Sequence, residues 1–332
     1  MALCVSLLAA GCATPAASRA TATLDVPVLA PVTTWAIQLQ GFDAATAATR
    51  LAQANVDMLV IEAMRSQRGE DEFPMRDVVQ RVQQSRGSAL PGKRCLAYLN
   101  VGQAEDYRRY WTESWRAPTA TTVGEPTFLL GLDPDGWRGN FPVAYWRPEW
   151  RRCLWGHPDA PLDQILADGF DGIYADWVLG FLDPGVRAAA AADGVDPAAA
   201  MVQLLADLRS YARAQHPLFV VVAQNALALV EQRPELIGAV DAFAQEDLSF
   251  RGLASATWND AGAGDIPAAP AGESTASDVG ERLRALRARG LPVFTLDYAL
   301  QPDNVAVAIA RSRALGLVPC VSRTPLDRLP PP

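Results

Sequence analysis

Histidine is scarce in this chain, whose 332 residues include only two, His157 and His216, each directly before a proline. Zinc sites and Ser-His-Asp triads are built around histidine, so both kinds of chemistry find little support. No Gly-x-Gly-x-x-Gly or phosphate-binding loop follows any of the apolar runs, which argues against nucleotide binding. The sequence therefore predicts no cofactor.

An excess of positive charge is also missing. The net charge is -8, with 29 basic and 37 acidic residues, and the isoelectric point is near 4.9. Nucleic-acid partners favour clustered Lys and Arg, so such a partner is not expected. A neutral or cationic ligand fits this composition better.

Cysteines are few, and beyond Cys12 only Cys95, Cys153 and Cys320 remain. An odd number leaves at least one thiol unpaired, and Cys95 and Cys320 lie in strand-like runs where a small buried thiol is common. We expect no required disulfide.

An apolar stretch typical of a targeting signal stands at the start of the chain. Residues 1–18 contain a short apolar stretch that ends in Leu8-Ala9-Ala10-Gly11-Cys12, a pattern typical of a lipoprotein cleavage box with Cys12 as the lipidated residue. No Lys or Arg precedes it, and a plain cleaved signal or an uncleaved anchor stays an alternative. No later run reaches the roughly 18 apolar residues of a membrane helix. We expect an exported bacterial envelope or extracellular protein that meets the membrane only through its lipid.

Three regions follow from this pattern. Residues 1–12 form the signal peptide with its lipobox, and residues 13–33, rich in Ala, Thr and Pro, form a flexible spacer. Residues 34–328 form one domain.

That domain repeats an apolar run followed, in most cases, by a helical stretch. The eight runs are Trp35–Gln40, Met58–Ala63, Arg94–Gly102, Gly172–Trp177, Phe219–Asn225, Ala242–Asp247, Pro292–Tyr298 and Val318–Arg323. Continuous apolarity predicts strands buried on both faces, hence a parallel sheet. Eight units in about 300 residues favour an α/β fold of the (β/α)8 TIM-barrel class over an open doubly wound sheet.

Two connections, after the third and sixth strands, are too long for simple turns. They run from Gln103 to Gly169 and from Leu248 to Thr275. Long strand-to-helix loops of a barrel build the rim of the active site. The second connection is equally compatible with a low-complexity insertion.

Carboxylates stand at the ends of several predicted strands: Glu62, Asp176, Glu246, Asp247 and Asp297, with Glu105 and Asp106 just after the third. Acids that converge on one mouth raise one another's pKa, and two carboxylates beside one bond are the minimal machinery of glycoside hydrolysis. Any one of these acids could instead cap a helix or form a salt bridge. Glu70-Asp71-Glu72 is more typical of a solvated surface.

Tryptophan is concentrated in the third connection and the strand after it. Seven of the nine lie there: Trp111, Trp115, Trp137, Trp146, Trp150, Trp155 and Trp177. Aromatic rings stack on sugars and attract cationic amino sugars. We expect most of them, however, to pack under the long connection.

Several spaced motifs, in order, resemble glycoside hydrolase family 114, which comprises endo-α-1,4-polygalactosaminidases and related barrel proteins. They are Tyr98-Leu99-Asn100-Val101-Gly102 with Glu105-Asp106-Tyr107, then Gly139-Asn140 with Tyr145-Trp146, Gly169-Phe170-Asp171-Gly172-Ile173-Tyr174-Ala175-Asp176-Trp177, Gln224-Asn225 and Gln245-Glu246-Asp247. The resemblance spans about Trp35 to Arg323.

This resemblance implies a barrel that cleaves α-1,4-linked galactosamine polymers with Asp176 and Glu246 as the catalytic pair. By analogy with barrels that use the same two strands, we expect Asp176 to be the nucleophile and Glu246 the acid/base of a retaining, endo-acting enzyme, with an inverting route still open. Other motif and strand-end residues are expected to bind substrate: Gln38, Glu62, Tyr98, Glu105, Asp106, Trp146, Trp177, Asn225, Asp247, Asp297 and Tyr298. Gln103, Ile37 and Glu62 depart from the usual family pattern, which leaves the exact sugar open.

Two rival functions remain. The chain could be a non-catalytic envelope lipoprotein that binds polysaccharide, because a barrel fold does not establish activity. It could also be a glycosidase for another α-linked sugar.

Overall fold

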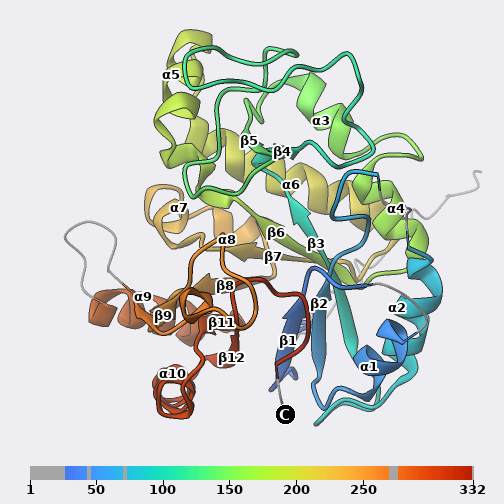
Figure 1. The fold of residues 1–332 in the computed structure, drawn as a ribbon, viewed down its shortest axis with the longest axis vertical. Helices are drawn as coiled ribbons and strands as arrows, with labels where there is room; N and C mark the ends of the chain where they lie inside the picture. Colours follow the sequence, from blue (N-terminus) through green and yellow to red (C-terminus); the bar gives the residue numbers. More distant parts are fainter. Residues whose placement is uncertain (1–26, 43–45, 70–72, 269–275, 331–332) are drawn as a thin grey trace, which may run out of the picture.

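One eight-stranded parallel sheet forms the centre of the computed structural model, which describes residues 27–42, 46–69, 73–268 and 276–330 (Figure 1). Its strands, in spatial order, are β1 (Trp35–Gln38), β2 (Met58–Ile61), β3 (Arg94–Asn100), β6 (Gly172–Asp176), β7 (Val220–Gln224), β8 (Ala242–Glu246), β11 (Val293–Tyr298) and β12 (Val318–Ser322). At the last seam β12 lies against β1, where Nε1 of Trp35 donates to the carbonyl oxygen of Val318 at 3.0 Å. The sheet is a nearly closed barrel, so the predicted fold class is confirmed.

Helices surround the sheet (Figure 1). They are α1 (Ala47–Gln53), α2 (Met75–Gln84), α3 (Pro148–Leu154), α4 (Pro161–Asp168), α5 (Pro184–Asp193), α6 (Pro197–Gln215), α7 (Leu227–Gln232), α8 (Leu236–Ala239), α9 (Ala276–Ala288) and α10 (Pro302–Ala314). Within the described ranges, no helix is long and apolar enough to cross a membrane.

Each predicted apolar run contains one barrel strand, in the predicted order. β2 and β7 are buried along their whole length, as strands covered on both faces must be. Most runs extend one or two residues beyond the strand that they contain. Those extra residues, together with the last strand residues, carry the polar groups of the site.

The connection after β3 holds a small antiparallel pair, β4 (Gln103–Glu105) and β5 (Asn140–Pro142), before α3 and α4. Beneath it Trp115 packs edge-on against Trp111 and Phe128, with ring centroids 5.2 and 5.3 Å apart, and Phe128 contacts the buried Trp150. These tryptophans form a local core, as expected for most of the group. The connection after β8 contains β9 (Phe250–Arg251) and β10 (Ile266–Pro267), which pair with each other.

The folded part begins before the predicted boundary at residue 34. Leu29 and Val32 are buried in the main core, so residues 27–33 pack against the barrel rather than extend as a spacer. The predicted signal segment and Cys12 lie outside the described residues. Cys95, Cys153 and Cys320 are unpaired thiols.

An aspartate directly precedes three strands and ties each to its neighbour. Asp57 before β2 accepts the N–H of Thr33 at 3.0 Å, Asp171 before β6 accepts that of Cys95 at 2.8 Å, and Asp241 before β8 accepts that of Val221 at 2.9 Å. In every case an acid follows five positions later, at the opposite end of the strand: Glu62, Asp176 and Glu246. Sequence reasoning recognised these acids but not the repeat that sets their height in the barrel.

Candidate active site

Asp176 and Glu246 are the last residues of β6 and β8, which flank β7. Alternation along a strand places Tyr174 and Asp176 on one face, and Tyr174 stacks on Trp35 inside the barrel at a centroid distance of 6.1 Å. The Tyr174 hydroxyl donates to Oε1 of Glu246 at 3.2 Å, so both acids face the interior at its mouth. Each keeps part of its surface exposed.

Asp176 receives two short hydrogen bonds. The Tyr98 hydroxyl donates to Oδ2 at 2.6 Å, and the backbone N–H of Trp177 donates to Oδ1 at 2.7 Å. Desolvation and the nearby charge of Glu246 nevertheless raise the pKa of Asp176 to about 7, because they outweigh these donors. The charge of Glu246 acts on Asp176 directly, so the two acids interact as a pair.

Glu246 is held by longer bonds. Tyr298 donates to Oε2 at 3.0 Å, Tyr174 to Oε1 at 3.2 Å, and the side chain of Gln224 also contacts the carboxylate. Desolvation, followed by the charge of the adjacent Asp247, raises the pKa of Glu246 to about 7. Burial raises the pKa of both tyrosines well above its ordinary value, so their hydroxyls remain neutral donors.

The backbone turns sharply after three successive strands. Trp177, Asn225 and Asp247 follow β6, β7 and β8, and they have positive φ angles of 59°, 50° and 56°. Non-glycine residues adopt this conformation at some energetic cost, and such residues concentrate at functional sites. In this conformation Oδ1 of Asn225 accepts the backbone N–H of Glu246 at 2.8 Å, which fixes the end of β8 where the following loop begins.

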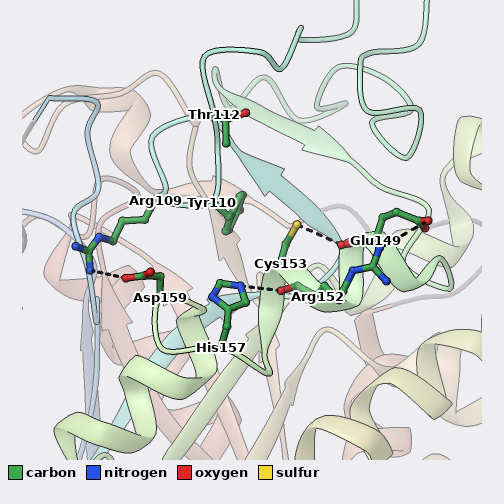
Figure 2. A pocket seen from close by; sticks show the side chains of 8 residues that line it. All are labelled: Arg109, Tyr110, Thr112, Glu149, Arg152, Cys153, His157 and Asp159. Atoms are coloured by element: carbon green, nitrogen blue, oxygen red, sulfur yellow. Dashed lines mark hydrogen bonds and ion pairs between the residues drawn. The ribbon is translucent and has the colours of Figure 1, made fainter.

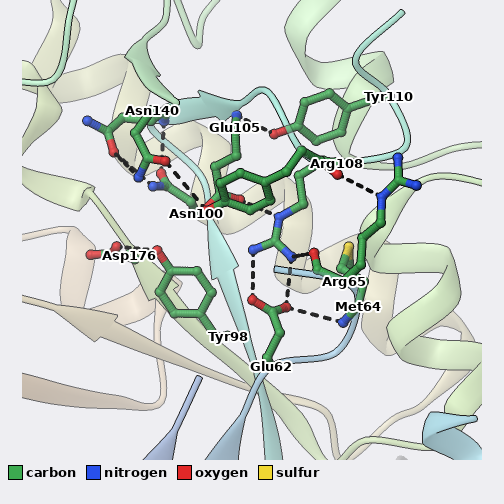
Figure 3. A network of polar contacts seen from close by, with 12 residues as sticks. Glu62, Met64, Arg65, Tyr98, Asn100, Glu105, Arg108, Tyr110, Asn140 and Asp176 are labelled. Atoms are coloured by element: carbon green, nitrogen blue, oxygen red, sulfur yellow. Dashed lines mark hydrogen bonds and ion pairs between the residues drawn. The ribbon is translucent and has the colours of Figure 1, made fainter. Parts of the chain in front are cut away.

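A buried ion-pair network lies on the other side of Tyr98 (Figure 3). Nη1 and Nη2 of Arg108 donate to the two oxygens of Glu62, each at 2.9 Å, and Nε donates to Oε2 of Glu105 at 2.5 Å. The Tyr107 hydroxyl donates to the other oxygen of Glu105 at 2.7 Å. Glu62, Glu105 and Arg108 are at most 3% exposed, so the two predicted substrate-binding acids are engaged with protein instead.

Three further predicted substrate-binding residues hold loops. Nε2 of Gln38 donates to the carbonyl oxygens of Gln40 and Asp327, which ties β1 to the C-terminal segment. Oδ1 of Asp297 accepts the N–H groups of Ser249 and Phe250 at 2.5 and 2.9 Å and so anchors the loop after β8. Asp106 forms an ion pair with Arg68 at 2.9 Å.

The predicted aromatic residues divide between the mouth and the periphery. Tyr98 and Tyr298 touch the catalytic candidates directly. Trp177 is half-buried, and its ring lies against Gly102 and Gly180, where a Cβ would overlap it. Trp146 donates from Nε1 to Asp193 at the end of α5 at 2.8 Å, so it joins the long connection to a helix and not to the acids.

Asp247 is exposed next to Glu246. Desolvation and the charge of Asp297 raise its pKa to about 7, Arg251 opposes the shift, and Asp135 of the third connection adds to it. Asp247 therefore belongs to the acidic mouth, beside the pair.

A separate cavity of about 380 Å³ opens between the loop after β4 and α3 (Figure 2). Its lining contains neither Asp176 nor Glu246 but Arg109, Tyr110, Thr112, Glu149, Arg152, Cys153, His157 and Asp159. Within the described ranges no group of three or more His, Cys, Asp or Glu side chains is arranged to hold a metal ion.

Sequence reasoning missed Arg108, Tyr174 and Gln224 as parts of the site. Tyr174 had a usable signal, because it lies two residues before Asp176 and so shares its face of the strand. Chemically, the site offers two interacting carboxylic acids with pKa values near neutrality, so one can be protonated while the other is ionised.

Comparison with known proteins gives the same architecture. The family model of glycoside-hydrolase family GH114 matches residues 13–330. An uncharacterised protein of Deinococcus radiodurans is 33% identical over 343 residues, covering 98% of this chain and 97% of its own. The glycoside hydrolase domain of PelA from Pseudomonas aeruginosa superposes with a TM-score of 0.58 at 21% identity, covering 90% of this chain and 97% of that domain. Aspergillus fumigatus Ega3, crystallised with galactosamine, gives a TM-score of 0.59 at 15% identity over 90% of this chain and 94% of its own.

Proposed function

Because the chain belongs to glycoside hydrolase family 114, we propose that it cleaves an α-1,4-linked galactosamine polymer with Asp176 and Glu246 as its two catalytic carboxylates. The observation that carries the proposal is the placement of these acids at the ends of β6 and β8, where the Tyr174 hydroxyl donates to Glu246 and the charge of Glu246 acts on Asp176, with the pKa of each acid raised to about 7. Two carboxylates beside one bond are the established requirement for glycoside hydrolysis.

The hydrogen bonds support different roles for the two acids. Asp176 accepts the shorter bonds, from Tyr98 and Trp177, and these stabilise its ionised form. Glu246 accepts longer bonds and lies beside Asp247, which favours its protonated form. We therefore assign the nucleophile to Asp176 and the acid/base to Glu246.

In the first step Glu246 gives its proton to the glycosidic oxygen as the bond to C1 breaks, and an oxygen of Asp176 bonds to C1. In the second step Glu246 takes a proton from water, whose oxygen attacks C1 and releases Asp176. Both acids return to their starting protonation states, and the anomeric configuration is retained.

The substrate class rests on charge. Asp247 and the neighbouring acids make the mouth anionic, which suits the ammonium groups of unacetylated galactosamine. Ega3, of the same fold, was crystallised with galactosamine.

Reducing-end release from α-1,4-galactosamine polymer tests the proposal. We expect Asp176→Asn and Glu246→Gln each to lower the rate by about 10²- to 10⁴-fold without a change in melting temperature. Undiminished cleavage in both variants would refute the assignment. A protein that retains the polymer without shortening it would instead be a binding protein, and cleavage of another α-linked polymer alone would change the sugar.

Stereochemistry tests the mechanism separately. NMR of the first product should show the α-anomer for a retaining enzyme, and azide added to Asp176→Ala should yield a glycosyl azide. A β-anomer as first product would assign the inverting route.

We further propose that the protein is exported and anchored through lipid on Cys12. Metabolic labelling with a fatty acid should mark the wild-type chain and not Cys12→Ser, whereas labelling of neither would refute the anchor.

A further inference from the structure

Exposed large apolar side chains gather on the loops that follow the C-terminal ends of the barrel strands. Five exposed side chains lie on these loops: Val123, Leu132, Trp137, Leu182 and Leu253. Within the described ranges, the other exposed large apolar side chains are Leu218, which precedes β7, and Val307, on α10. Because all such loops emerge at the same end of a barrel, these side chains lie on the face that holds Asp176 and Glu246. Apolar groups exposed on a face that carries a polar site are typical of ligand-binding surfaces.

Residues 131–137 carry two of them on a braced turn. Oδ1 of Asp133 accepts the N–H groups of Asp135 and Trp137 at 2.8 and 2.9 Å, and Oδ2 accepts Nε2 of Gln103 at 2.5 Å. Gln103 in turn accepts a bond from Nδ2 of Asn100 at 2.9 Å. Asn100 is the β3 residue in register with Asp176, so this chain of side chains ties the turn to the strand end beside the nucleophile.

The turn also reaches toward β8. Asp135 lies close enough to Asp247 for its charge to act on that carboxyl, together with those of Asp297 and Arg251. Asp135 and Asp247 are both exposed, and the indole of Trp137, two residues further on, keeps 38% of its surface open. A flat apolar surface beside carboxylates matches an amino sugar, which has an apolar ring face and a positive charge.

We propose that Trp137 and Asp135 form an outer sugar-binding subsite, in which the indole stacks on one galactosamine ring and Asp135, with Asp247, binds its ammonium group. This inference rests on the proposed substrate class and deepens it, because it makes the preferred substrate a chain longer than the sugars at the cleaved bond. Binding energy from the subsite then acts on KM for long chains more than on kcat.

Calorimetric titration tests the subsite independently of cleavage. The probes are α-1,4-galactosamine disaccharide, a long oligosaccharide of the same series and its fully N-acetylated form, each added to Glu246→Gln protein. Trp137→Ala, introduced as a second substitution in the Glu246→Gln protein, should lower the ratio of long-chain to disaccharide affinity by about tenfold. Adding Asp135→Asn should lower this ratio at low salt by about threefold to tenfold, with a smaller loss at high salt and none for the N-acetylated chain, which lacks ammonium groups.

Matched controls lie outside the loop that carries Asp135 and Trp137. Leu218→Ala removes an exposed apolar side chain before β7, and Glu235→Gln removes an exposed acid before α8. Neither should change the affinity ratio. An unchanged ratio in both Trp137→Ala and Asp135→Asn, or no binding of the long chain to the parent, would overturn the subsite.

The two proposals can fail separately. If the otherwise wild-type protein leaves the polymer intact while Trp137→Ala still lowers the affinity ratio, the subsite stands and the hydrolase assignment falls. If the polymer is cleaved but the ratio is insensitive to both substitutions, only the subsite falls.

Discussion

Tyr98→Phe removes one hydroxyl from the site and leaves the ring in place. In the wild-type protein that hydroxyl donates to Oδ2 of Asp176 at 2.6 Å and stabilises the ionised carboxylate. A hydrogen bond to a charged group contributes about 1.5–3 kcal/mol, and one pKa unit corresponds to about 1.4 kcal/mol. The substitution should therefore raise the pKa of Asp176 from about 7 by about one to two units.

The consequence appears on the acidic side of the pH profile. A nucleophile must be ionised, so a higher pKa moves the acidic limb of kcat/KM to higher pH. At pH 7 about half of the wild-type Asp176 is ionised, so a rise of one to two units lowers the rate there by about 5- to 50-fold. Tyr145→Phe is the matched control, because its hydroxyl donates to the carbonyl oxygen of Pro197 at 2.8 Å and contacts neither acid. We expect that variant to keep the wild-type profile.

The assay is the pH dependence of reducing-end release, with the melting temperature of each variant measured at the same pH values. An acidic limb in Tyr98→Phe that is unmoved or shifted downward would refute the view that this hydroxyl stabilises ionised Asp176. A parallel shift in Tyr145→Phe would show a general effect on the fold.

Three stability predictions follow from buried contacts. Arg108→Met leaves two buried carboxylates unpaired and should lower the free energy of unfolding by about 3–5 kcal/mol in urea titrations; a loss below about 1 kcal/mol would contradict that network. For Asp57, burial is outweighed by the N–H groups of Ala89, Thr33 and Leu90, which hold its pKa well below 3.8. The contribution of ionised Asp57 to the free energy of unfolding is therefore full above pH 4 and is lost as the pH falls. Asp57→Asn should lower the free energy of unfolding by about 3 kcal/mol at pH 7 and by less at pH 2. An equal loss at both pH values would exclude the charge as the cause. Gly102→Ala places a Cβ against the Trp177 carbonyl, so it should lower the free energy of unfolding by about 1–3 kcal/mol and lower kcat. Gly131 has open space around it, so Gly131→Ala should leave both quantities unchanged.

The strand order and the catalytic candidates were predictable because their signals are local. Continuous apolar runs specify strands buried on both faces, and an acid at the end of such a run, as in Ile173-Tyr174-Ala175-Asp176, is brought to the mouth by the barrel itself. The aromatic core under the third connection was predictable for a similar reason, because tryptophans crowd one segment.

Side-chain partners were much less predictable. Gln38 and Asp297 lie at strand ends like the catalytic candidates, but they bind backbone groups of neighbouring segments. Arg108 is 46 residues from Glu62, and nothing in Tyr107-Arg108-Arg109-Tyr110 distinguishes the arginine that becomes buried from its exposed neighbour. Such contacts depend on the register and tertiary packing of elements far apart in the chain.

The aspartates before β6 and β8 impose a limit on how this barrel can be altered. From Asp171 to Asp176 the chain advances about 16 Å at about 3.3 Å per residue, and the spacing from Asp241 to Glu246 is the same. A single residue inserted between such an aspartate and its acid would turn the acid toward the outer helices, since successive side chains point to opposite faces. A change in the length of the loops beyond the acids leaves the height of the acids in the barrel unaltered, whereas the five-residue interval from each aspartate to its acid must keep its length.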